Sequence, residues 1–175
     1  LIIPGLVILA NIYQCGSELD RAISDNIDRT NNQGKDQLVD LNIGIRLAYA
    51  GDLEAIAELS RSSFMSAFAA KNTPENMASY LQQAFATDVI AAQLSDLNRC
   101  IILAEHDQGL AGYATLRRDS QEPCISSTQN IELERLYAAT ELVGHGVGVQ
   151  LLQEAIRIAR EEYCQSIWLG VWEHN

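Results

Sequence analysis

Three glycines within five residues separate two segments of regular pattern, and this turn constrains the fold more than any other feature. The strand-like segment 131–138 precedes it. After it, apolar side chains recur at helical spacing over residues 152–163, while polar side chains take the opposite face. Backbone N–H groups in such a strand-turn-helix unit converge at the positive end of the helix, which favours an anion. The glycines, which allow close approach of a ligand to the backbone, are Gly144, Gly146 and Gly148.

Two common nucleotide-binding motifs do not fit this turn. A Walker A loop requires Gly-Lys followed by Ser or Thr, but Val149 and Gln150 follow Gly148. A dinucleotide-binding fingerprint requires G-x-G-x-x-G and an acidic residue about 20 positions on, whereas the spacing here is G-x-G-x-G and the next strand offers Trp and Leu. The pyrophosphate of coenzyme A and a tight turn without a ligand remain as alternatives.

The rest of the pattern predicts one mixed α/β (α+β) domain with a mostly antiparallel sheet. Asp52 precedes the first helical stripe, and Thr73-Pro74 is a typical helix start. Residues 106–109 link two strand-like runs and end in Gly109, which suits a hairpin turn. Strands are expected at 43–48, 99–105, 110–117, 131–138 and 167–172, and helices at 53–64, from 74, at 88–97 and at 152–163.

Charge and hydropathy exclude several kinds of partner. The chain has 12 basic and 23 acidic residues, for a formal charge of −11, which opposes binding to nucleic acid. An acidic surface attracts a cationic amine, but it also serves solubility alone. The opening apolar run 1–10 is interrupted by Pro4 and Gly5 and is shorter than the ~20 residues of a membrane span. We therefore expect neither nucleic acid nor membrane as a partner.

The cysteines and histidines show no metal-ligand spacing. The four cysteines are far apart and include no C-x-x-C pair, so no zinc or redox site is expected. Unpaired cysteines are typical of a reduced, cytoplasmic protein. The polar segment 17–42 has the composition of a linker, and the domain is expected to begin at residue 43.

Several segments together resemble the GNAT family of N-acetyltransferases, in particular its PaiA-like branch, which acetylates spermidine and spermine. They are residues 131–137, the loop 144–148, the helix opening 149–152, the end 168–175 and the segment 72–77. The resemblance covers about 43–175 and implies a GNAT-like sheet flanked by helices. A complete GNAT domain continues with another helix and two more strands, so the resemblance implies a domain that is incomplete at its C-terminus, after an N-terminal extension (1–42) of unknown role.

The resemblance also implies acetyl-CoA as co-substrate and no metal. Leu136 and Tyr137 would pair their backbone with the pantetheine arm, and Asn175 stands where the family often places a cofactor-contacting Asn. Val143 replaces the Gln or Arg of the family's loop pattern, although its backbone N–H is unaffected. The implied pyrophosphate-binding residues are Val143, Gly144, His145, Gly146, Val147 and Gly148.

Glu132 and Glu134 are the candidate catalytic residues. Alternation along a strand places both on one face, about 7 Å apart. An amine must lose a proton to attack a thioester, so a carboxylate there suits a general base. A solvated or ion-paired row of glutamates is the alternative, and the sequence does not separate the two residues.

The sequence thus predicts an acetyl-CoA-dependent N-acetyltransferase that acts on a small amine, with a polyamine among the candidates. The alternative is a catalytically impaired remnant that binds CoA or a protein partner, because the Tyr that the family uses as general acid has no counterpart. The apolar strand 167–172 would need a cover for Trp168 and Trp172. Either the N-terminal run 2–12 folds back on it, or a second copy does so in a homodimer, which we favour.

Overall fold

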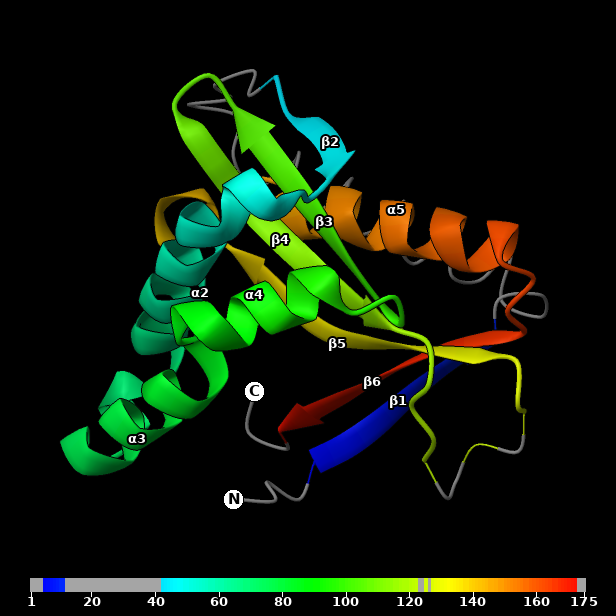
Figure 1. Ribbon diagram of the computed structural model, residues 1–175, viewed down its shortest axis with the longest axis horizontal. Helices are drawn as coiled ribbons and strands as arrows, with labels where there is room; N and C mark the ends of the chain where they lie inside the picture. Colours follow the sequence, from blue (N-terminus) through cyan, green and yellow to red (C-terminus); the bar gives the residue numbers. More distant parts are fainter. Residues whose placement is uncertain (1–4, 12–41, 123–124, 126, 173–175) are drawn as a thin grey trace.

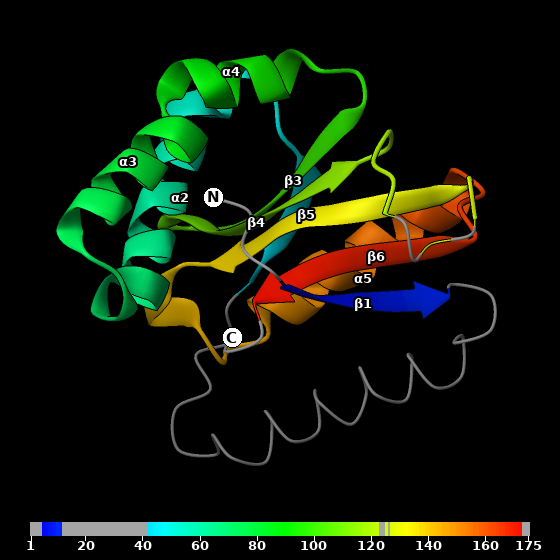
Figure 2. The ribbon, with the colours of Figure 1, turned by 90° about the horizontal axis from the view of Figure 1, so that it is seen from below.

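The described residues form one six-stranded sheet with helices on both faces (Figures 1 and 2). The structure is a computed structural model that describes residues 5–11, 42–122, 125 and 127–172. The strand order is β1-β6-β5-β4-β3-β2, and β5 with β6 is the one parallel pair in this sheet. The predicted α/β class and mostly antiparallel sheet are confirmed. The strands are β1 (Gly5–Asn11), β2 (Gly44–Leu47), β3 (Arg99–His106), β4 (Gly109–Arg117), β5 (Asn130–Ala138) and β6 (Ser166–Trp172).

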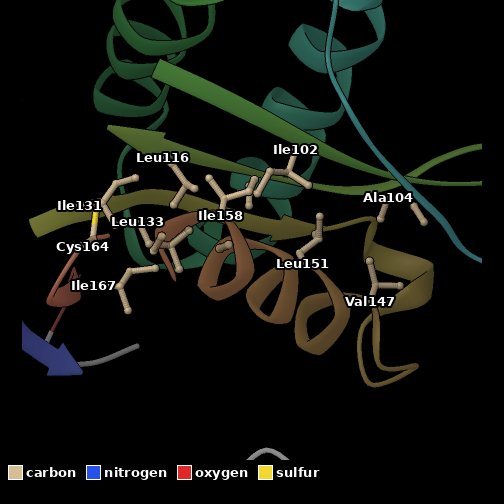
Figure 3. Close-up of a cluster of buried hydrophobic side chains, with 14 residues drawn as sticks. Ile102, Ala104, Leu116, Ile131, Leu133, Val147, Leu151, Ile158, Cys164 and Ile167 are labelled. Carbon is tan, nitrogen blue, oxygen red and sulfur yellow. The ribbon is translucent and has the colours of Figure 1, made fainter. Parts of the chain in front are cut away.

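Two apolar layers cover the sheet. The helix α5 (Val147–Glu161) packs on one face, and α2 (Leu53–Phe68), α3 (Pro74–Phe85) and α4 (Thr87–Ser95) pack on the other (Figure 2). Leu151 and Ile158 of α5 meet buried residues of four strands (Figure 3). On the opposite face, Phe64 stacks on Tyr80 with ring centroids 4.4 Å apart. The loop that follows β5 and the start of α5 are thereby fixed against a packed core.

Local sequence signals account for most element boundaries. Gly109 has φ +131° in the β3–β4 hairpin, a conformation that favours glycine. Thr73 Oγ1 accepts a hydrogen bond from Asn76 N at 3.3 Å and caps α3, as predicted. The predicted cap of α2 is wrong, since the Asp52 side chain accepts hydrogen bonds from Arg46 and from the backbone N–H of Tyr49 instead.

The outer edge of β6 is covered by the chain itself. The N-terminal strand β1 pairs antiparallel with β6 over seven residue pairs, from Gly5 with Trp172 to Asn11 with Ser166. Of the two predicted covers, the structure therefore shows the folding back of the N-terminal run. Trp168, which was expected to need a cover, is 3% exposed. The homodimer stays a prediction, and covering β6 does not require it. The boundary between an extension and a domain at residues 42 and 43 also stays a prediction, although β1 belongs to the same sheet.

Gly112 allows the start of α5 to approach β4 closely. A Cβ at this position would lie 2.7 Å from the carbonyl oxygen of Tyr137 and 2.8 Å from Cγ1 of Val147. Because the first of these atoms is backbone, we expect Gly112→Ala to lower the free energy of unfolding by about 1–3 kcal/mol, measured by urea denaturation. Gly44→Ala, whose Cβ would meet nothing closer than 3.8 Å, is the matched control and should change it by about 0.5 kcal/mol or less. Equal losses in the two variants would contradict this account.

Candidate functional site

The strands β5 and β6 run together only at their beginnings. They pair in parallel at three positions, from Asn130 with Ser166 to Glu132 with Trp168, and then diverge (Figures 1 and 2). Past Glu132, no residue of β6 pairs with β5 in the described part of the chain. One edge of β5 therefore keeps unpaired backbone N–H and C=O groups, which an extended ligand can satisfy as an added strand would.

A buried hydrogen bond fixes the point of divergence. The indole N–H of Trp168 donates to Asn130 Oδ1 at 3.0 Å, and Asn130 Nδ2 donates to the backbone carbonyl of Ser127 at 2.6 Å. Asn130 is 4% and Trp168 3% exposed. Because a buried amide and indole left unpaired would be costly, these contacts hold the two strands together up to Glu132.

The glycine turn leads from the end of β5 into α5. Gly144 and Gly146 have φ values of +86° and +83°, so the backbone there requires glycine. Gly148 has no such requirement, and a Cβ on it would meet no atom within 4 Å. Its lack of a side chain is therefore not explained by the fold, whereas a ligand that lies against the backbone would explain it.

The N-terminus of α5 has backbone N–H groups that, among the described residues, are available to bind an anion. The residue at its start, Gly146, has no side chain to cap the helix, and the first helical hydrogen bond runs from Gln150 N to Gly146 O at 3.1 Å. The N–H groups of residues 146–149 have no intrahelical partner. Four converging donors at the positive end of a 15-residue helix fit a pyrophosphate. Val149, which the sequence reasoning did not include, belongs to this set.

The other predicted cofactor residues divide by their surroundings. Val143 and His145 are exposed, but their N–H groups bond within the turn, to Thr140 O at 3.4 Å and Leu142 O at 3.2 Å. Val147 is 1% exposed and packs in the core, so only its backbone can contact a ligand. Leu136 and Tyr137 lie on β5 beyond the divergence. Asn175 lies outside the described residues.

A β-bulge interrupts β5 at Glu134. Thr115 pairs with Arg135 and Leu116 pairs with Leu133, so Glu134 of β5 has no paired residue on β4. The alternation predicted for Glu132 and Glu134 holds up to Glu134, and the bulge breaks it between Glu134 and Arg135. Glu134 and Arg135 both turn toward the α2–α4 face, where Arg135 donates to Gln93 Oε1 at 2.8 Å and its guanidinium lies 4.9 Å from the Phe85 ring centroid.

The structure separates the two candidate glutamates. Arg99 Nε donates to Glu134 Oε2 at 3.1 Å, and Arg99 is also ion-paired with Asp96, so Glu134 belongs to a charge network. Glu132 Oε2, in contrast, is buried without a hydrogen-bond partner among the described residues. Burial raises the pKa of Glu132 above its usual value. A carboxylate with a free oxygen and a raised pKa is the better proton acceptor.

Sequence reasoning missed the charged residues around Glu132. Arg117 lies directly opposite Glu132 on β4, and its Nη1 is 4.0 Å from Glu132 Oε2. Asp119, two residues on, accepts a hydrogen bond from Arg117 Nε at 3.2 Å. The spacing of Arg117 and Asp119 at the end of a strand could have indicated that the two side chains interact. It could not indicate that Arg117 lies opposite Glu132, because that pairing depends on the register that the bulge sets.

The tyrosines near β5 do not supply an evident acid. The Tyr113 hydroxyl is hydrogen-bonded to Ser60 Oγ at 2.8 Å, and the residue is 1% exposed. Burial raises the pKa of Tyr113 to about 12. Burial also raises the pKa of Tyr137, whose ring lies 5.7 Å from that of Tyr113. We therefore assign Tyr113 to the core.

In the part of the chain that the structure describes, no group of three or more His, Cys, Asp or Glu side chains is arranged to hold a metal ion. None of the described helices has the length and apolar character needed to cross a membrane.

The sequence matches a protein-family model and several curated relatives. Residues 53–175 match the model of the acetyltransferase (GNAT) family. The chain is 31% identical over 124 residues to an uncharacterized N-acetyltransferase from the pepI 3′ region of Lactobacillus delbrueckii subsp. lactis, which covers 71% of this chain and 72% of that protein. An uncharacterized N-acetyltransferase of Mycobacterium tuberculosis is 27% identical over 124 residues, covering 71% and 75% of the two chains.

Solved structures show the same fold. The PaiA N-acetyltransferase of Thermoplasma acidophilum in complex with coenzyme A is 25% identical, with a TM-score of 0.61 over 71% of this chain and 76% of that one. The aminoglycoside N-acetyltransferase AAC(6′)-Iy, also in complex with CoA, shares the fold at 16% identity, with a TM-score of 0.60 over 77% and 80%. The chain belongs to the GNAT acetyltransferase family and is an acetyl-CoA-dependent N-acyltransferase.

Proposed function

We propose that this enzyme transfers an acetyl group from acetyl-CoA to a primary amine of a small molecule, with polyamines as the expected class. One observation carries the proposal: the pairing of β5 with β6 ends at Glu132, whose buried Oε2 has no hydrogen-bond partner among the described residues. The unpaired edge of β5 leads from there toward the turn before α5. The same edge thus links a phosphate-binding turn to a proton acceptor.

Each part of this edge has a separate task. The N–H groups of residues 146–149 bind the pyrophosphate, and the unpaired edge of β5 near Leu136 and Tyr137 hydrogen-bonds the pantetheine amides. The bound thioester supplies an activated acetyl group. Glu132 accepts a proton from the amine, and the neutral nitrogen attacks the acetyl carbonyl. The new C–N bond forms as the thioester C–S bond breaks and CoA leaves as its thiolate. The general acid that protonates the departing thiolate is not assigned.

Charge supports a cationic acceptor. The formal charge of −11 raises the local concentration of polyamines and other cations at the surface. The resemblance of the sequence to the PaiA-like branch, which acetylates spermidine and spermine, also supports a polyamine. Nothing in the described structure favours the alternative of a catalytically impaired remnant, because Glu132 keeps a free oxygen at the point of divergence. The cytoplasmic location and the absence of nucleic-acid and membrane partners stay predictions.

Gly148→Ala should weaken coenzyme A binding without harming the fold. A methyl group there meets no protein atom within 4 Å, so it would stand in the space proposed for the pyrophosphate. We expect the Kd for CoA, measured by calorimetry, to rise about 10-fold, equal to about 1.4 kcal/mol. Stability should stay constant or rise by up to about 1 kcal/mol, since alanine favours helix. Gln153→Ala, on an exposed position of the same helix, should leave the Kd unchanged. A Kd unaffected by the methyl group would remove this turn from the site.

Glu132→Gln should lower kcat/KM for spermidine acetylation by about 100-fold or more and abolish the acid limb of its pH profile. In the unaltered enzyme that limb should lie above the ordinary glutamate range, since the base must be deprotonated and burial raises its pKa. The matched control is Glu134→Gln, whose carboxylate is already engaged by Arg99; it should keep the limb. If the Glu132→Gln variant retains the acid limb, Glu132 is not the general base.

A further inference from the structure

Arg117 is turned away from the carboxylate that it faces. Arg117 and Glu132 are paired in the β4–β5 register, so their side chains lie directly across from one another. A guanidinium and a carboxylate within reach of each other frequently form two parallel hydrogen bonds. Here the shortest approach is 4.0 Å, from Nη1 to Oε2, and that oxygen has no hydrogen-bond partner among the described residues.

Asp119 accounts for this orientation. Its Oδ1 accepts the hydrogen bond of Arg117 Nε at 3.2 Å, and its Oδ2 lies 3.5 Å from Asn98 Nδ2. Asn98 precedes β3, and its backbone carbonyl accepts a hydrogen bond from Arg118 N at 2.9 Å. Asp119 is thus held beside the end of β4, where its hydrogen bond orients the Arg117 guanidinium toward it.

The other charged groups near Glu132 do not replace Asp119. Glu134 is engaged by Arg99, and Asp96 is ion-paired with Arg99 as well. The negative charges of Glu134 and Glu122 favour protonation of Glu132, whereas a hydrogen bond with Ser120 and the charge of Arg117 oppose it. On the β6 side, the neighbour of Glu132 is the uncharged Trp168. Of the described residues, Asp119 and Glu132 are the carboxylates within 4.0 Å of the Arg117 guanidinium.

We propose that Asp119 is a positioning residue that holds Arg117 away from Glu132 and so leaves that carboxylate free to accept the proton of the amine. The proposal rests on the function assigned to Glu132 above. If Arg117 closed onto Glu132, both carboxylate oxygens would be occupied and the charged form would be stabilised. Glu132 would then be a weaker base. Asp119 acts through Arg117 and need not touch the substrate.

The test compares pH profiles of kcat/KM for Asp119→Ala, Arg117→Gln and the double variant. In Asp119→Ala, Arg117 moves onto Glu132, so the acid limb should shift to lower pH by about 0.5–1 unit, and the plateau should fall. Arg117→Gln removes the opposing charge, so the limb should shift to higher pH. The double variant should follow Arg117→Gln, because Asp119 has no arginine left to hold. Asp107→Ala, which removes an exposed carboxylate in the β3–β4 hairpin, is the matched control and should leave the profile unchanged.

A second measurement separates this proposal from the function on which it rests. The carboxyl 13C resonance of Glu132 in glutamate-labelled protein reports its pKa without turnover. A lower pKa in Asp119→Ala, and a smaller decrease in Asp119→Asn, support the positioning role even if Glu132→Gln shows that another group is the base. An unchanged pKa in a folded Asp119→Ala protein overturns the positioning role, whatever Glu132 does.

Discussion

The short parallel contact between β5 and β6 is the feature on which the site depends. It extends over three residue pairs and is held by the buried hydrogen bond between Trp168 and Asn130. A longer pairing would satisfy the edge of β5 and leave no backbone groups for a ligand. Without any pairing, β6 would have no fixed place beside Glu132. The partial pairing therefore gives both an open edge and a fixed end. Glu132, whose Oε2 has no hydrogen-bond partner among the described residues, lies at that end.

Such a contact leaves β6 weakly attached, and β1 compensates for this. Seven pairs join β1 to β6, against three between β6 and β5. Sequence reasoning foresaw that an apolar last strand needs a cover but favoured a second copy of the chain. The structure uses the chain's own N-terminal strand. The physical reason is that a tethered segment meets its target at a high effective concentration that does not depend on dilution. β1 thus supports β6 from its outer side, beside the edge of β5 that is proposed to bind the cofactor.

Local patterns predicted the elements well, because each depends on signals a few residues long. Gly109 in the hairpin and Thr73 at the start of α3 perform the predicted roles. What the sequence could not predict depends on contacts between different elements. Asp52 pairs with Arg46 rather than capping α2, because a charged partner six residues away competes with the helix end. The choice between Glu132 and Glu134 likewise depended on Arg99, 35 residues away from Glu134.

The bulge at Glu134 explains why a strand with so mixed a sequence can cross the centre of the sheet. Strict alternation from Leu133 would turn Arg135 into the apolar layer under α5, where an unpaired guanidinium would be very costly. One extra residue puts Arg135 on the opposite face instead, against Gln93 and Phe85, and returns Leu136 to the α5 layer. The same shift sets the register that brings Arg117 opposite Glu132. The core on one face and the electrostatics of the proposed base on the other are therefore set by a single irregularity in β5.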